Sequence, residues 1–129
     1  MRLKRRALLR AMFDRNREDV GTLVRGSVRM LYRFAGDSEL DPGSPVQVAF
    51  AAPRGTSGVS RTAIRRRLRE SFRLVCSDLT DALRKTSRHL TVVLIGRSAS
   101  RDVQREVNYL VGEMTRMVLS HERPPQPTH

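Results

Sequence analysis

An apolar repeat of helical period is the strongest pattern in the chain. At about 100° per residue, apolar side chains spaced by three or four positions fall on one side of a helix and mark the side that packs against a core. The repeat predicts a long helix that is capped by Ser60 or Thr62 and ends near Lys85. Its members are Ile64, Leu68, Phe72, Val75, Leu79 and Leu83.

A second repeat of the same kind predicts a last helix near the end of the chain. We expect Ser98 or Ser100 to cap it and Asp102 to lie in its first turn, where the helix dipole favours an anion. A shorter pattern over residues 5–16 predicts a first helix. The apolar face of the last helix comprises Val103, Val107, Leu110, Val111, Met114, Met117 and Val118.

Three segments have the alternation or the composition of β-strands. Residues 28–33 alternate between apolar and polar side chains and predict a strand with one wetter face. Residues 46–52 predict a second strand, and a hairpin between the two is plausible. Residues 90–95 are the most apolar and β-branched run of the chain, which predicts a buried central strand. Gly21 and Gly26 indicate irregular chain before the first of these strands.

The order of the predicted elements defines the fold class. The order α-β-β-(β)-α-β-α is typical of an α+β fold in which helices pack on a small sheet. Proline, glycine and acidic residues over 36–45 predict a loop. We expect one domain over residues 1–120 and a disordered tail over residues 121–129, because the tail is rich in proline and polar residues.

The charge of the chain narrows its function. There are 25 basic and 13 acidic residues, a formal net charge of +12, and all but two of the basic residues are arginine. A polyanion such as nucleic acid is the partner that compensates such a charge best. The alternative explanation of the charge is that it only keeps the protein soluble. Cys76 is the one cysteine, which excludes an internal disulfide and indicates a reducing compartment. With no apolar run of 18 residues, we expect a cytoplasmic protein without a membrane partner.

Much of this charge lies on the predicted long helix. Residues 61–73 contain six arginines and one acidic residue. On a helical projection four of the arginines form one ridge beside the apolar side, whereas Arg67 points away from it. Like charges at this spacing repel each other, so a bound anion would stabilise the helix; the alternative is a solvated face that Glu70 and Asp78 partly neutralise. The ridge comprises Arg65, Arg66, Arg69 and Arg73.

Other candidate groups are fewer and less specific. Phe13 and Tyr32 lie among arginines and could stack on bases, although a core position is more common for each; Phe50, Phe72 and Tyr109 are expected in the core. The histidines are isolated and there is no second cysteine for a zinc site, so the sequence does not supply an active site of its own.

The run from Val59 to Arg73 resembles the signature of the bacterial ribonuclease P protein subunit. The resemblance continues in order at Arg2–Arg6 with Met12–Phe13, at Leu31–Tyr32 and at residues 91–97. Thr62 stands where the family usually has asparagine, Ala63 where it has a basic residue and Ser57 where lysine is common. The matching positions are Val59, Arg61, Arg66, Arg69, Glu70, Phe72 and Arg73, with Arg65 in place of lysine.

The resemblance implies a fold and a function. The fold would be that of the second domain of ribosomal protein S5, with a left-handed β-α-β crossover. The protein would be a non-catalytic subunit of an endoribonuclease that removes the 5′ leader of precursor tRNA, and the catalytic RNA subunit would use divalent metal such as Mg²⁺. It would need no cofactor and no small-molecule substrate. Phe13 and Tyr32 would line a cleft for the leader. The residues implied to contact RNA are Arg54, Arg61, Arg65, Arg66, Arg69 and Arg73.

Two alternatives share the charge and the ridge. One is a generic RNA-binding or ribosome-associated protein without a processing role. The other is a DNA-binding protein with the basic helix in the major groove, which is disfavoured because a reading helix must expose its polar side chains on an open face.

Overall fold

The computed structural model describes residues 20–34 and 45–120 and contains four strands and two long helices in these ranges. The predictions for residues 1–19, including the first helix and Phe13, lie outside the described residues, as do the loop over 36–44 and the tail from 121. The elements are β1 (Gly21–Arg25), β2 (Val28–Phe34), β3 (Val46–Ala51), α2 (Gly58–Thr86), β4 (Leu90–Gly96) and α3 (Asp102–Leu119).

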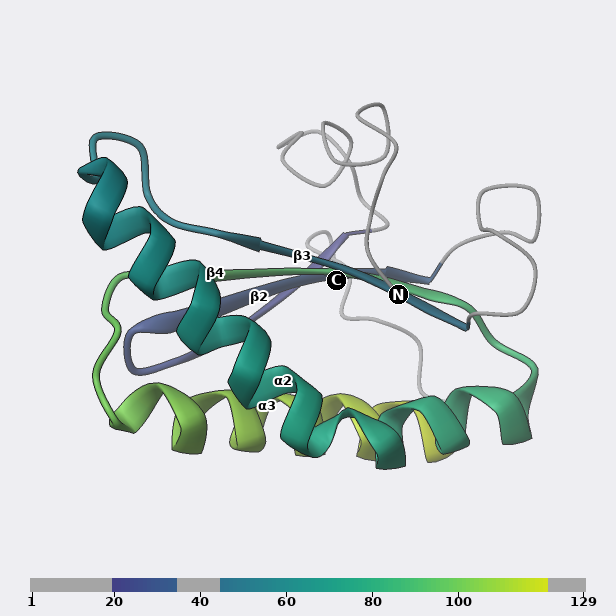
Figure 1. Ribbon diagram of the computed structural model, residues 1–129. Helices are drawn as coiled ribbons and strands as arrows, with labels where there is room; N and C mark the ends of the chain where they lie inside the picture. The colour runs from purple at the N-terminus through teal and green to yellow at the C-terminus, as the bar shows by residue number, and fades with distance from the viewer. Residues whose placement is uncertain (1–19, 35–44, 121–129) are drawn as a thin grey trace.

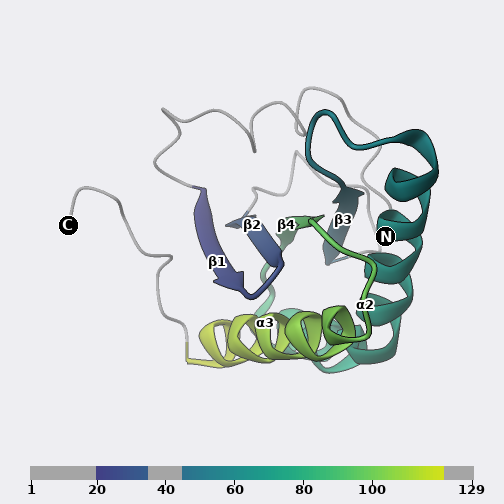
Figure 2. The same ribbon diagram turned by 90° about the vertical axis from the view of Figure 1, so that its left-hand side faces the viewer.

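The strands form one mixed sheet in the order β1-β2-β4-β3. β2 is antiparallel to β1 and to β4, whereas β3 is parallel to β4. Both helices lie on the same face of the sheet, with α3 beneath β1 and β2 and α2 running diagonally across the β3 side (Figures 1 and 2). The α+β class predicted from the sequence is therefore confirmed.

The crossover from β3 through α2 to β4 is left-handed. Both parallel strands run toward the left of Figure 1, which is the side that faces the viewer in Figure 2. In Figure 2, β4 lies to the left of β3, and α2 runs down the right-hand side of the sheet and then beneath it. Crossovers between parallel strands are right-handed in about 98% of cases, so this is a distinctive feature of the chain. It was expected from the family resemblance, and the described elements show it directly.

The predicted strand pairing was wrong in two respects. β2 does not form a hairpin with β3, because β4, the most apolar strand, lies between them. The segment before β2 is not irregular but forms β1, which pairs with β2 through a two-residue turn at Gly26 and Ser27. Gly26 has a φ of 59°, a conformation that favours glycine, so the glycine marks the turn of a hairpin and not a break.

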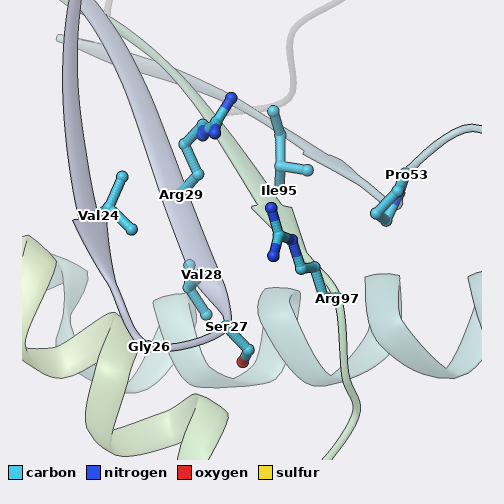
Figure 3. Close-up of a pocket in the computed structure, with 8 residues that line it drawn as sticks. All are labelled: Val24, Gly26, Ser27, Val28, Arg29, Pro53, Ile95 and Arg97. Carbon is cyan, nitrogen blue, oxygen red and sulfur yellow. The ribbon is translucent and has the colours of Figure 1, made fainter.

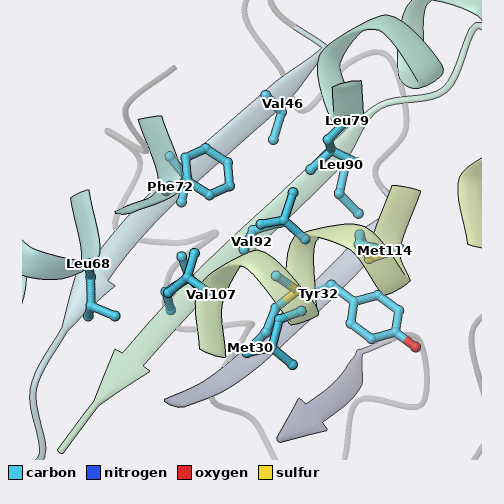
Figure 4. Close-up of a cluster of buried hydrophobic side chains, with 14 of the residues drawn as sticks. Met30, Tyr32, Val46, Leu68, Phe72, Leu79, Leu90, Val92, Val107 and Met114 are labelled. Carbon is cyan, nitrogen blue, oxygen red and sulfur yellow. The ribbon is translucent and has the colours of Figure 1, made fainter. Parts of the chain in front are cut away.

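The apolar repeats predicted the core correctly. Ile64, Leu68 and Phe72 are at most 4% exposed, and Val75 packs against the core from its edge. These side chains of α2 pack against alternate residues of the sheet, including Met30, and against the apolar face of α3 (Figure 4). On α3 the residues buried are Val103, Val107, Leu110, Val111, Met114 and Val118.

Three finer predictions were wrong. α2 is capped by Ser57, whose Oγ accepts a hydrogen bond from the Ser60 N–H at 3.3 Å, one turn earlier than predicted. α3 has Arg101 at its cap position without a side-chain cap, and the Ser98 Oγ instead accepts a hydrogen bond from the Ser100 N–H at 3.1 Å. Tyr109 is 45% exposed and does not belong to the core.

Tyr32 is a core residue with an unsatisfied hydroxyl. Its ring (Figure 4) lies over Gly21 of the neighbouring strand, where any Cβ would overlap it, and its hydroxyl is buried without a hydrogen-bond partner among the described residues. Burial raises the pKa of Tyr32 from 10.0 to about 12. Folding therefore favours the neutral phenol, whose contribution is complete below pH 10 and is lost as the pH rises toward 12.

Tyr32→Phe is expected to raise the free energy of unfolding at neutral pH by about 1 kcal/mol, because it removes an unpaired buried hydroxyl. The variant should also lose less stability than the wild type between pH 10 and 12. Urea denaturation at neutral and alkaline pH measures both effects. A destabilised variant at neutral pH would show that the hydroxyl has a partner.

A carboxylate fixes the β1–β2 turn to α3. Glu106 accepts hydrogen bonds from the Ser27 N–H at 3.0 Å and from the Ser27 Oγ at 2.7 Å. A Cβ at position 26 would overlap this carboxylate, so the glycine also makes room for it. The pair joins residues 79 positions apart in the chain.

Glu106→Ala is expected to lower the free energy of unfolding by about 2 kcal/mol, because two charge-assisted hydrogen bonds are lost. Glu113→Ala is the matched control: its carboxylate forms an i,i+3 pair with the exposed Arg116, and its loss should change stability by less than about 0.5 kcal/mol. Equal effects of the two substitutions in urea denaturation would show that the Ser27 contact contributes little.

Candidate nucleic-acid interface

The arginine ridge of α2 is exposed along its whole length. Arg65, Arg66, Arg69 and Arg73 are all exposed, and in the described part of the chain none forms a hydrogen bond or an ion pair. The Arg69 Cζ lies 6.0 Å from the centroid of the Phe50 ring, which places the ridge beside the edge strand β3. Arg67 is partly buried and does not share this exposure.

Packing beneath the ridge sets its direction. Phe72 meets Phe50 of β3 edge to face, with ring centroids 6.1 Å apart. A Cβ at Gly96 would lie 3.2 Å from Ile64 and 3.3 Å from Leu68, so the glycine lets the start of α2 approach the end of β4 closely. Because these contacts fix the rotation of α2 about its axis, the guanidinium groups leave the helix in defined directions.

The loop before α2 is held by a further arginine. The Arg61 Nη2 donates a hydrogen bond to the carbonyl oxygen of Thr56 at 3.2 Å, and the Thr56 Oγ1 donates to that of Pro53 at 2.7 Å. Gly55, with a φ of 91°, provides the turn between them. Arg54 is exposed on this loop, whereas Arg61 is partly buried. Arg61 thus positions the loop, and Arg54 is free to meet a partner.

Two residues at which the sequence departs from the signature it resembles have local roles at this end of α2. Ser57 provides the helix cap, and the Thr62 Oγ1 donates a hydrogen bond to the Gly58 carbonyl oxygen at 3.0 Å. Ala63 is exposed. Ser57 and Thr62 therefore stabilise the first turn of the helix.

The face of the sheet opposite the described helices carries a second basic feature. A pocket of about 220 Å³ lies near the β1–β2 turn, and Arg29 and Arg97 stand on either side of Ile95 within it (Figure 3). Val24 and Pro53 add apolar walls. Two guanidinium groups around an apolar floor suit a nucleotide, whose phosphate and base need these two kinds of contact.

Sequence reasoning did not single out Arg29 and Arg97. A usable signal was present, because Arg29 lies on the wetter face of its predicted strand and Arg97 follows the predicted central strand directly. What was missing was the register, which sets Arg29 opposite Ile95 and so brings Arg29 near Arg97.

Tyr32 does not line this pocket. Its side chain is fully buried on the helix-covered face, where its ring meets that of Phe34 edge to face at 6.4 Å. The structure thus favours the core interpretation of Tyr32 over a stacking one. Phe13, its predicted companion, lies outside the described residues.

The described residues contain neither a cluster of metal-ligating side chains nor a membrane-spanning helix. Within residues 20–34 and 45–120, no three side chains of histidine, cysteine, aspartate or glutamate come together as a metal site. In the same ranges, no helix is long and apolar enough to cross a membrane.

Comparison with known proteins returned one similarity of structure. The chain is similar to the RNase P protein of Staphylococcus aureus, with a TM-score of 0.49, 13% sequence identity, and 96% of this chain and 97% of that chain covered. No family model matches the sequence, and no curated protein does.

Proposed function

We propose that this protein is the non-catalytic protein subunit of a ribonuclease P, which assists a catalytic RNA in removing the 5′ leader of precursor tRNA. The observation that carries the proposal is the exposed ridge of Arg65, Arg66, Arg69 and Arg73, which forms no hydrogen bond or ion pair within the described residues. Its sequence context resembles the family signature. Planar guanidinium groups held in fixed directions favour phosphate oxygens, since each can bond two of them.

The arginine ridge and the pocket at Arg29 and Arg97 would bind different parts of the RNA. The ridge and Arg54 would bind the backbone of the RNA subunit. The pocket at Arg29 and Arg97 would hold a nucleotide of the single-stranded leader, in place of the cleft at Tyr32 expected from the sequence. Divalent metal ions such as Mg²⁺ would be held by the RNA, which would carry out the hydrolysis.

The pocket makes a specific prediction. Arg29→Ala combined with Arg97→Ala is expected to weaken binding of leader-bearing precursor tRNA to the reconstituted complex about tenfold, because two phosphate contacts are lost. Binding of mature tRNA should not change. Titration of labelled precursor and mature tRNA measures both. An equal loss of affinity for precursor and mature tRNA would show that these arginines do not contact the leader.

The same measurement on the wild type separates the proposal from a generic RNA-binding or ribosome-associated protein. A processing subunit should increase the affinity of the RNA subunit for precursor tRNA over mature tRNA. A generic binder should increase both alike. Equal affinities for the two substrates would therefore favour the generic alternative.

A further inference from the structure

An arginine stacked on an exposed tyrosine lies at the corner between β1 and α3. The Arg25 Cζ is 4.3 Å from the centroid of the Tyr109 ring. Tyr109 is 45% exposed, and Arg25 is also exposed. Both partners of this contact are therefore accessible, and bases stack both on aromatic rings and on guanidinium planes.

No carboxylate is paired with Arg25. Among the residues that the structure describes, Arg25 forms no hydrogen bond or ion pair. Glu106, one turn before Tyr109 on α3, accepts hydrogen bonds from Ser27. Asp102 pairs with Arg105 at 2.6 Å. Neither carboxylate thus bonds Arg25, and the N–H groups of its guanidinium remain available to an incoming phosphate or base.

The stack is continuous with the nucleotide pocket. Gly26 and Ser27, which follow Arg25 directly, line the pocket together with Val24 (Figure 3). Arg25 is on the helix side of the sheet and Arg29 is on the opposite side, so the β1–β2 turn forms the rim between them. A single strand leaving the pocket over this rim would reach the Arg25–Tyr109 stack next.

We propose that the Arg25–Tyr109 stack is a base-stacking site for single-stranded RNA, one step beyond the Arg29–Arg97 pocket. The inference rests on the proposed function, because it extends the leader path of that function. Tyr109 supports the plane of the guanidinium, and Arg25 presents it to the base. Stacking on such a platform is tolerant of sequence, since every base has a π face.

The test compares a single-stranded oligoadenylate with an abasic ribose-phosphate strand of the same length, each fluorescently labelled, in binding to the full chain. Arg25→Lys keeps the charge and removes the plane, and Tyr109→Leu removes the ring. Both are expected to weaken oligoadenylate binding about fivefold and to leave binding of the abasic strand unchanged. Arg105→Lys, on the same helix, is the control and should change neither affinity.

Three outcomes bear on the inference. Selective loss for oligoadenylate supports it. An equal loss for both strands, or a lower melting temperature without any loss of binding, assigns the stack a purely structural role and overturns it while leaving the proposed function intact. A wild-type protein that binds neither strand contradicts the leader path of the proposed function and this site with it.

Discussion

Replacing Arg65 and Arg69 by alanine is expected to weaken binding to the RNA subunit about ten- to a hundredfold. Both guanidinium groups are exposed on the ridge and form no hydrogen bond or ion pair within the described residues, so their N–H groups are free to bond a phosphate. Each phosphate contact contributes about 0.7 to 0.9 to the slope of log K against log salt, so the slope should fall by about 1.4 to 1.8. Filter binding across a salt series measures both quantities.

A charge-matched control separates contact from net charge. Arg84→Ala combined with Arg116→Ala also removes two positive charges, from the last turn of α2 and the last turn of α3. Its salt slope should stay close to that of the wild type. If both double variants lowered the slope equally, RNA binding would follow the total charge of +12 and not the ridge.

Phe72→Ala is expected to lower the free energy of unfolding by about 3 to 5 kcal/mol. Phe72 is 1% exposed and packs against Phe50, so truncation leaves a cavity between α2 and β3. Domains are stable by only about 5 to 15 kcal/mol, so the loss is a large part of the total. Because this contact also sets the rotation of α2, RNA binding should weaken even where the variant remains folded.

Leu74→Ala is the control for this substitution, because Leu74 is 64% exposed on the same helix. Urea denaturation should show a change within about 0.5 kcal/mol for Leu74→Ala. A similar stability of the two variants would mean that the apolar side of α2 is not what fixes the ridge.

Periodicity predicted those parts of the fold that depend on burial. The positions of Ile64, Leu68 and Phe72 determine which side of α2 is packed, and the direction of the ridge follows from that side. The isolated apolar run at residues 90–95 correctly predicted a central strand. In each case the residues of one continuous segment are enough to predict which side chains are buried.

Strand pairing could not be obtained in this way. That β2 pairs with β4, and that Arg29 consequently lies near Arg97, depends on contacts between residues 56 to 68 positions apart in the chain. Gly21 begins β1 and Gly26 follows it, and from the sequence alone either glycine could mark irregular chain or a strand end. The role of Gly26 becomes clear only from the Glu106 carboxylate that lies beside it. Tyr109 shows where helical periodicity fails to predict burial: its ring is apolar enough for a core, and yet it contacts Arg25 at the surface.

Cleavage of precursor tRNA by the RNA subunit, measured at limiting magnesium with and without the protein, tests the central claim most directly. If the protein is the ribonuclease P subunit, it should accelerate cleavage and lower the magnesium concentration needed for half-maximal rate. The Arg65→Ala, Arg69→Ala variant should lose most of this effect. A cleavage rate that the wild-type protein leaves unchanged at every magnesium concentration would contradict the account.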